Sequence, residues 1–387
     1  MGDSGKKLRV GILGCANIAK KNCRAIQASA LCGVTVVASR SDQKARDFIS
    51  EIFEDQNQSS PSALGGEGAY DELLTGTVCD ATYIPLPTKL HEEYVAKALS
   101  SGKHVLLEKP VAQSALSYRE MLSTASQHGK FLMDGTMFVH HSRTEEFIKS
   151  IRNPNRVRFS FTFNGCNNFF KNNVRVKKDA DFMGCIGDLG WYCVRMGLLV
   201  FSQMDSAELR KGLIQEVQVV KYQLNEEGVP LDADCLVYFS GNRVLTFHCS
   251  FIHPFTQTCS IYGTGSEYTA TLSDAILPYK GDYLSISLTK NELIQYDEIC
   301  VSESKVIEVD NTDVQEVCMW KNFSKMVAKV DEESKSQESD IENEVWWGGS
   351  SDEVKKANAI ASYSLHTQIV LDALMESIRL GGAKVKV

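Results

Sequence analysis

Short apolar runs alternate with amphipathic helical patterns along the first third of the chain. Between the runs, apolar residues recur every three to four positions, which is the spacing of one buried helix face. Strands that alternate with helices in this way form a parallel sheet covered by helices. Residues 1–137 are therefore predicted to form a doubly wound α/β domain, with residues 55–67 as a surface loop. The apolar runs begin near residues 8, 34, 81, 104 and 131.

After residue 137 the pattern changes to a helix, a strand and a second helix near residues 187–203. From residue 214 to about residue 290, strand patterns follow one another directly. Ser240-Gly241-Asn242 separates two of them as a hairpin-type turn. Residues 138–387 are therefore predicted to form an α+β domain with a large, mainly antiparallel open sheet.

The C-terminal part contains two further segments. Residues 331–345 are acidic, rich in serine and nearly free of apolar residues, so we expect a mobile insertion there. Residues 353–380 carry apolar positions at helical spacing and are predicted to form a last helix that packs on the body of the protein.

Length, charge and cysteine usage narrow the class of protein. The chain has 387 residues, 43% of them hydrophobic, and a net charge of −8, which favours a soluble two-domain protein and argues against nucleic-acid binding. No apolar run suggests a membrane span, and no leader pattern is present, so we expect a cytoplasmic protein. The 12 cysteines show no metal-ligand spacing and no metal site is predicted. A small-molecule partner is the remaining expectation.

The loop after the first apolar run resembles a dinucleotide-binding loop with alanines at two glycine positions. The first glycine is retained as Gly14, and Ala16 and Ala19 add one methyl group each, so a diphosphate is still expected at the start of the following helix. The alternative is a strand-turn-helix that binds nothing. The candidate cofactor-binding residues here are Gly14, Cys15, Ala16, Asn17 and Ile18.

The second strand ends in Ser39, Arg40 and Ser41 instead of the acidic residue that suits NAD. A guanidinium flanked by hydroxyl groups suits the 2′-phosphate of NADP. The alternative is that Arg40 is a solvated surface residue and that Ser41 or Asp42 caps the next helix.

Two segments supply candidate catalytic residues. Lys109 follows Glu108 at the carboxyl end of a strand, where doubly wound folds bind ligands. Asp188 and Tyr192 lie four residues apart at the start of an apolar helix and are expected to share one face. The alternatives are a surface lysine at position 109 and a carboxylate at position 188 that stabilises the helix terminus.

Taken in order, these segments resemble the glucose-fructose oxidoreductase/inositol dehydrogenase (Gfo/Idh/MocA) family, and within it the dihydrodiol dehydrogenase and D-xylose dehydrogenase branch. The resemblance implies a Rossmann domain that binds NADP(H), a homodimer formed through the C-terminal sheet, and Lys109 and Asp188 as catalytic residues. Tyr192 stands where many members have histidine, which assigns proton transfer to a Lys-Tyr pair. The segments that carry the resemblance are residues 14–19, 83–87, 108–110, 133–137 and 187–192.

The same resemblance places further residues around the cofactor. The loop with Pro85, Leu86 and His91, together with Glu108 and Lys109, is expected to border the nicotinamide and its ribose. Candidates for the substrate pocket are Met137, Phe138, Asn164, Phe169, Arg175 and Trp191.

The leading hypothesis is an NADP(H)-dependent oxidoreductase that transfers a hydride between the nicotinamide and a carbonyl or alcohol of a sugar, cyclic diol or specialised metabolite. In this reaction the cofactor supplies the hydride and the protein supplies position and proton. One alternative is an enone or imine reductase. The other is a sensor or scaffold that binds NADP without turnover.

Overall fold

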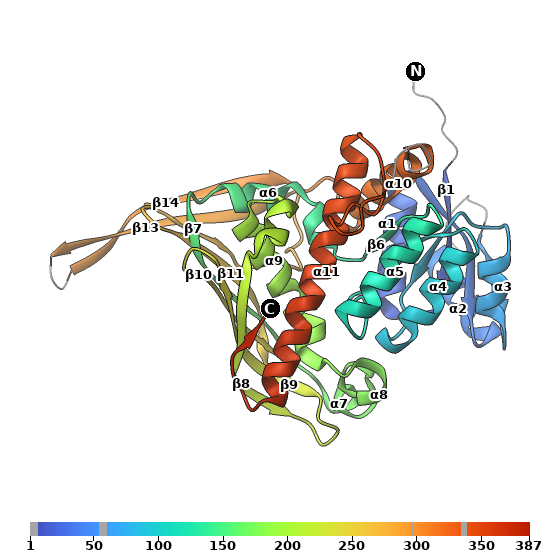
Figure 1. The fold of residues 1–387 in the computed structure, drawn as a ribbon, viewed down its shortest axis with the longest axis horizontal. Coiled ribbons are helices and arrows are strands. Elements are labelled where there is room, and N and C mark those ends of the chain that lie inside the picture. The colour runs from blue at the N-terminus through green and yellow to red at the C-terminus, as the bar shows by residue number, and fades with distance from the viewer. Residues whose placement is uncertain (1–6, 54–59, 296–297, 334–338) are drawn as a thin grey trace. The chain divides into compact units, whose positions relative to one another are not determined.

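The chain folds into two compact units in a computed structural model that describes residues 7–53, 60–295, 298–333 and 339–387 (Figure 1). Unit 1 contains residues 1–140 and 314–362, and unit 2 contains residues 141–313 and 363–387. The predicted boundary at residue 137 is three residues short of the observed one. The prediction also missed the return of residues 314–362 to unit 1.

Unit 1 is built on a six-stranded sheet in the order β3-β2-β1-β4-β5-β6. All neighbouring strands are parallel, and β4, β5 and β6 are buried along their whole length, as expected for a sheet with helices on both faces. The strands are β1 (Leu8–Leu13), β2 (Cys32–Ser39), β3 (Ser62–Gly65), β4 (Ala81–Ile84), β5 (His104–Leu107) and β6 (Leu132–Asp134). The helices that connect them are α1 (Asn17–Ala28), α2 (Asp42–Phe53), α3 (Ala69–Thr75), α4 (His91–Ser100) and α5 (Ala115–Gln127), with short 3-10 turns at Thr88–Leu90 and Met137–His140.

Strand β3 corrects the prediction of a surface loop over residues 55–67. It pairs with β2 at the edge of the sheet, with Ser62 opposite Val36. The strand has four residues, and none of its side chains is buried, so it lacks the apolar alternation by which strands are recognised. The first part of the predicted loop, residues 54–59, lies outside the described residues.

The return segment of unit 1 contains helix α10 (Gln315–Glu333). Its Trp320 is fully buried, donates from Nε1 to Asn22 Oδ1 at 2.8 Å and meets the ring of Tyr83 edge-on at 5.8 Å. Trp347, further along the segment, donates to the Lys130 carbonyl at 2.9 Å. The segment therefore completes the core of unit 1 instead of belonging to the second domain.

The predicted mobile insertion over residues 331–345 has intramolecular partners in the part that the structure describes, and its mobility stays a prediction. Asp331 lies in the last turn of α10, accepts a hydrogen bond from His104 Nε2 at 3.1 Å and forms an ion pair with Lys130 at 2.9 Å. Asp340 and Val345 pair through backbone hydrogen bonds. The acidic residues gain partners that composition does not reveal. Residues 334–338 lie outside the described residues.

Unit 2 contains a nine-stranded sheet in the order β14-β13-β12-β11-β7-β10-β9-β8-β15. Every pair is antiparallel except β7 with β10, which confirms the predicted open sheet. The β9–β10 hairpin turns at Gly241 and Asn242, both with positive φ, as predicted. β13 and β14 extend as a long hairpin (Figure 1). The strands are β7 (Pro154–Asn164), β8 (Ile214–Leu224), β9 (Pro230–Phe239), β10 (Arg243–Ser250), β11 (Ile252–Gly263), β12 (Thr269–Leu272), β13 (Tyr283–Gln295), β14 (Glu298–Asp310) and β15 (Val385–Lys386).

Helices of unit 2 include α9 (Trp191–Ser202), every residue of which is buried. The helical segment Lys178–Ser202 is long and apolar enough to cross a membrane, but its most apolar window lies entirely inside the protein, as in the core helix of a globular domain. Helix α11 (Asp352–Arg379) belongs to unit 1 up to residue 362 and to unit 2 from residue 363, and it matches the predicted last helix within one residue at each end. The remaining helices of unit 2 are α6 (Ser142–Lys149), α7 (Asn167–Asn172) and α8 (Lys178–Asp181), with short turns at Val174–Val176, Ile186–Gly190 and Ser206–Lys211.

Candidate functional site

The loop between β1 and α1 has the geometry of an anion-binding turn. Gly14 is buried with φ of +98°, and a Cβ atom there would lie 3.1 Å from Leu86 Cδ2. Helix α1 begins after Ala16 without a side-chain cap. Its first N–H groups are therefore available to a phosphate, which the positive end of the helix dipole also favours.

The two alanines in this loop are compatible with that role. Ala16 has φ of −73° and ψ of 155°, a conformation that any L-residue adopts. Ala19 is fully buried, and its N–H donates to the Ala16 carbonyl at 3.0 Å. Only Gly14 occupies a backbone conformation that requires glycine, so the loss of the other two glycines leaves the turn intact.

Two lysines, Lys20 and Lys44, act electrostatically on this loop. Burial raises the pKa of the Cys15 thiol, whereas a hydrogen bond with Ser39 and the charges of Lys44 and Lys20 act in the opposite direction. Asn17 and Ile18 are exposed at the start of the helix. The loop therefore offers backbone donors in a region of positive potential.

At the end of β2, Ser39 is buried and Arg40 and Ser41 are exposed. Ser41 Oγ accepts a hydrogen bond from the Lys44 N–H at 3.3 Å, which is the capping role considered as the alternative. Arg40 remains exposed beside the Tyr70 hydroxyl: burial raises the pKa of Tyr70, and the Arg40 charge opposes that rise. Helix capping by Ser41 and an exposed Arg40 guanidinium that interacts with the Tyr70 hydroxyl thus coexist.

His91 is predicted to border the cofactor, and in the structure its ring contacts two backbone carbonyls. Its side chain is buried, with Nε2 2.8 Å from the Leu86 carbonyl and Nδ1 3.2 Å from the Val111 carbonyl. Burial lowers its pKa to about 4 despite these carbonyls. His91 therefore links the loops after β4 and β5, and Pro85 beside it is buried as well.

Glu108 and Lys109 follow β5 at the carboxyl end of the parallel sheet, where both are half-buried. Glu108 Oε1 accepts a hydrogen bond from the Tyr83 hydroxyl at 2.5 Å, and Tyr83 in turn accepts one from Asn22 Nδ2 at 2.8 Å. Because Asn22 also holds Trp320, a continuous hydrogen-bonded chain leads from α10 to Glu108. These hydrogen bonds fix the Glu108 carboxylate that precedes Lys109. The composition of the sequence did not indicate them.

In unit 2, Asp188 lies in a π-helical turn formed by Ile186–Gly190, directly before α9. Arg175 Nε lies 2.9 Å from Asp188 Oδ1, and the side chains are 38% and 12% exposed. The Asp188 charge raises the pKa of Arg175 against the effect of burial. The structure therefore pairs Asp188 with Arg175, a residue predicted to contact substrate, which is a partnership that the sequence analysis missed.

Tyr192 lies in the first turn of α9, 7% exposed, with its ring edge-on to Phe161 at 5.7 Å. Its hydroxyl also acts electrostatically on Arg175. The structure thus groups Asp188, Arg175 and Tyr192 within unit 2. Trp191 is fully buried with the Arg195 guanidinium over its ring, and its contact with substrate stays a prediction.

The remaining substrate candidates occupy three different environments. Asn164 is exposed at the end of β7. Phe169 is half-buried among the rings of Phe163, Phe170 and Phe251. Met137 and Phe138 are buried at 7% and 1% exposure, and their contact with substrate stays a prediction.

Comparison with known proteins agrees with this geometry. Residues 8–136 match the Gfo/Idh/MocA model, described as an oxidoreductase family with an NAD-binding Rossmann fold. A dTDP-3,4-didehydro-2,6-dideoxy-alpha-D-glucose 3-reductase from Streptomyces violaceoruber is 33% identical over 286 residues, 71% of this chain and 75% of that protein. A D-xylose 1-dehydrogenase (NADP(+)) from Haloferax volcanii is 31% identical over 262 residues, 67% of this chain and 74% of that protein.

Among solved structures, a 3-ketoreductase from Actinomadura kijaniata in complex with NADP and TDP-benzene has the same fold. Its TM-score is 0.74 at 21% identity, and the match covers 96% of this chain and 98% of that one. The expected fold and family are both confirmed. The chain belongs to the Gfo/Idh/MocA family of oxidoreductases with an NAD-binding Rossmann fold.

Proposed function

We propose that this oxidoreductase uses NADP(H) to interconvert a carbonyl and an alcohol on a sugar-like substrate. The observation that carries the proposal is the arrangement at the edge of the unit 1 sheet. Gly14 and the uncapped start of α1 offer donors to a diphosphate, and Arg40 lies exposed at the end of β2.

The preference for NADP over NAD rests on charge. A 2′-phosphate is an anion that accepts charge-assisted hydrogen bonds, and Arg40 can supply two of them in parallel. No acidic residue stands among Ser39, Arg40 and Ser41 to hold a ribose 2′-hydroxyl. The xylose dehydrogenase relative is named as an NADP(+) enzyme, and the solved ketoreductase structure contains bound NADP. Both support a preference for NADP.

Bound NADP(H) would supply or accept a hydride, and the residues of this chain would handle the proton and position the substrate. We assign proton transfer at the reacting oxygen to Lys109 and Tyr192. A phenol ordinarily titrates near about pH 10, so a neighbouring cation is needed to favour its ionised form. Within unit 2 the Arg175 guanidinium interacts electrostatically with Tyr192, and Asp188 holds Arg175 in place.

The relatives support both the residue types and the substrate class. Solved forms of the ketoreductase include variants in which a lysine is replaced by alanine or glutamate, and a tyrosine by phenylalanine. The names of the relatives describe reduction of a dTDP-linked keto sugar and oxidation of D-xylose. We therefore assign a sugar or sugar nucleotide as substrate. The homodimer and the cytoplasmic location stay predictions.

A fluorescence titration with NADPH and NADH tests the cofactor proposal. Arg40→Ala should weaken NADPH binding by about 10- to 100-fold, as expected when a charged hydrogen-bond donor is lost, and leave NADH binding nearly unchanged. Arg46→Ala is the matched control, because Arg46 is an exposed arginine of α2 paired with Asp42. Equal NADPH affinity in both variants would contradict the assignment.

Turnover with keto sugars and sugar nucleotides tests the catalytic assignment. Lys109→Ala and Tyr192→Phe should each lower kcat by about 10²- to 10⁴-fold, the usual contribution of a proton-transfer group. NADPH affinity should change little in Tyr192→Phe. Full turnover in either variant would show that the proton is handled elsewhere.

A further inference from the structure

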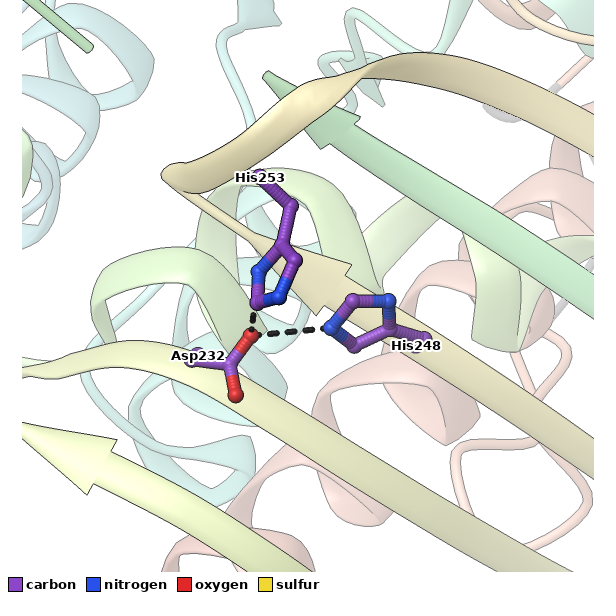
Figure 2. Close-up of side chains that lie close together, drawn as sticks. All are labelled: Asp232, His248 and His253. Carbon is purple, nitrogen blue, oxygen red and sulfur yellow. Dashed lines mark hydrogen bonds and ion pairs between the residues drawn. The ribbon is translucent and has the colours of Figure 1, made fainter. Parts of the chain in front are cut away.

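A cluster of two histidines and one aspartate lies in unit 2, apart from every residue assigned above to cofactor or catalysis. His248 Nε2 lies 2.8 Å and His253 Nδ1 3.1 Å from the same oxygen, Oδ1 of Asp232. Figure 2 shows both rings directed at that carboxylate from two sides. The three potential ligand atoms all lie within 4.8 Å of one another.

The sheet register brings these residues together. Asp232 of β9 pairs with Ser250 of β10, and His248 pairs with Asp234. Because side chains alternate between faces, Asp232 and His248 lie diagonally on one face. The chain then turns into β11, where Ser250 Oγ accepts from the Ile252 N–H at 3.1 Å and lies 2.9 Å from His253 Nδ1. The turn thus holds the second ring over the carboxylate.

Burial distinguishes this cluster from a chance surface contact. The Asp232 side chain is 4% exposed, whereas those of His248 and His253 are 27% and 45% exposed. A buried carboxylate therefore faces two imidazoles that remain partly open to solvent.

The cluster is also accessible to a small ion. His248 and Asp234 line a hollow of about 510 Å³ on the outer face of the sheet, between strands β7 to β11. Polar side chains, including Thr246, Thr258 and Ser260, line the same hollow. A small ion and its water ligands can therefore reach the His248 ring from this hollow, and the His253 side chain is 45% exposed to solvent.

We propose that Asp232, His248 and His253 bind a single zinc ion, with water in the remaining coordination position. Imidazole nitrogen and carboxylate oxygen are ordinary zinc ligands at about 2.0–2.2 Å, and three protein ligands leave a tetrahedral site with one open position. Tetrahedral ligands at that distance lie about 3.3 Å apart. The two separations from Asp232 Oδ1 reach this value after shifts of a fraction of an ångström, and the two imidazole nitrogens, which lie within 4.8 Å of each other, would turn toward the bound ion.

Zinc suits this set better than calcium or magnesium, which prefer ligand sets composed of oxygen. The ion would replace the protons that now link the rings to Asp232 and would join β9, β10 and the start of β11. Because binding occurs in the folded state, zinc should also raise the unfolding temperature.

The test uses the full-length chain without a histidine tag, stripped with EDTA and dialysed into metal-free buffer. Calorimetric titration with ZnCl₂ should give one ion per chain and a higher Tm at saturation. Titration with CoCl₂ should give the visible absorption of a four-coordinate site. Failure to bind zinc, or binding without any change in Tm and without that absorption, overturns the proposal.

Variants identify the ligands. His253→Gln and His248→Gln should each weaken zinc binding by more than about tenfold, since loss of an outer partner of a ligand already costs that much. His128→Gln is the control, because His128 is exposed in unit 1, where its Nδ1 lies 2.9 Å from the Thr124 carbonyl. Circular dichroism verifies that each variant is folded. His253 is the most exposed of the three ligands, so His253→Gln is expected to disturb the fold least. Unchanged affinity in folded His253→Gln overturns the assignment.

Discussion

At the scale of single residues, backbone conformation decides which part of the nucleotide loop is indispensable. Gly14 has a φ that L-residues with side chains rarely adopt, whereas Ala16 is extended. A comparison of sequence patterns alone treats all three glycine positions alike. The structure separates them, because only the first requires glycine.

We expect Gly14→Ala to lower stability by about 1–2 kcal/mol and to weaken NADPH binding, because the added Cβ would lie 3.1 Å from Leu86 Cδ2 at a strained φ. The control is Gly33→Ala, where no atom lies within 4 Å of the added Cβ. Ala16→Gly should leave NADPH affinity unchanged. Thermal unfolding and fluorescence titration measure both effects, and tighter binding in Ala16→Gly would show that alanine obstructs the pyrophosphate.

At the scale of elements, His91 links two loops at the carboxyl end of the sheet. Its ring spans the Leu86 carbonyl after β4 and the Val111 carbonyl after β5. These loops flank Pro85 and Lys109, so the histidine positions the surroundings of the candidate site, and its predicted contact with the cofactor stays a prediction. A sequence cannot distinguish the two roles, because both place a histidine after a strand.

This burial gives a pH dependence of stability. The pKa of His91 is lowered from 6.5 to about 4 in the folded chain, so the unfolded chain binds the proton more readily. Its contribution to stability is complete above about pH 6.5 and is lost as the pH falls from about 6.5 to 4. The total is at most about 3 kcal/mol.

Urea unfolding of wild type and His91→Gln across this pH range checks the prediction. Subtracting the two curves removes the contribution of other titrating groups. The wild type should lose more stability than the variant as pH falls, and parallel curves would show that the buried ring does not control the loss.

At the scale of the whole molecule, the return segment completes unit 1. Trp320 fills its core and begins the hydrogen-bonded chain through Asn22 and Tyr83 to Glu108. Residues separated by more than 200 positions thus cooperate beside Lys109. The C-terminal third of the chain therefore supports the nucleotide-binding unit as well as unit 2.

Trp320→Ala should destabilise unit 1 by about 3–5 kcal/mol, the usual cost of removing a buried tryptophan. Trp320→Phe keeps the apolar ring but loses the N–H donated to Asn22, so a smaller loss of about 1–2 kcal/mol is expected. Urea denaturation followed by circular dichroism measures both. Equal stability of Trp320→Ala and wild type would contradict the role of the segment.

The sequence by itself determined the α/β nature of the first domain, the large antiparallel sheet, the hairpin at Gly241 and the last helix, because each depends on local periodicity or turn chemistry. It also identified the family through ordered motifs, and from them came the expectations for Lys109, Asp188 and Tyr192.

Only the tertiary structure decided the partners of these side chains. It showed β3 at the sheet edge, α10 in unit 1, Arg175 beside Asp188, Trp191 in the core, and the cluster of Asp232, His248 and His253. Each of these features depends on residues distant along the chain or on strand register. The local spacing of residues in the sequence predicts neither. Periodicity specifies which face of an element is buried, whereas packing selects what lies against it.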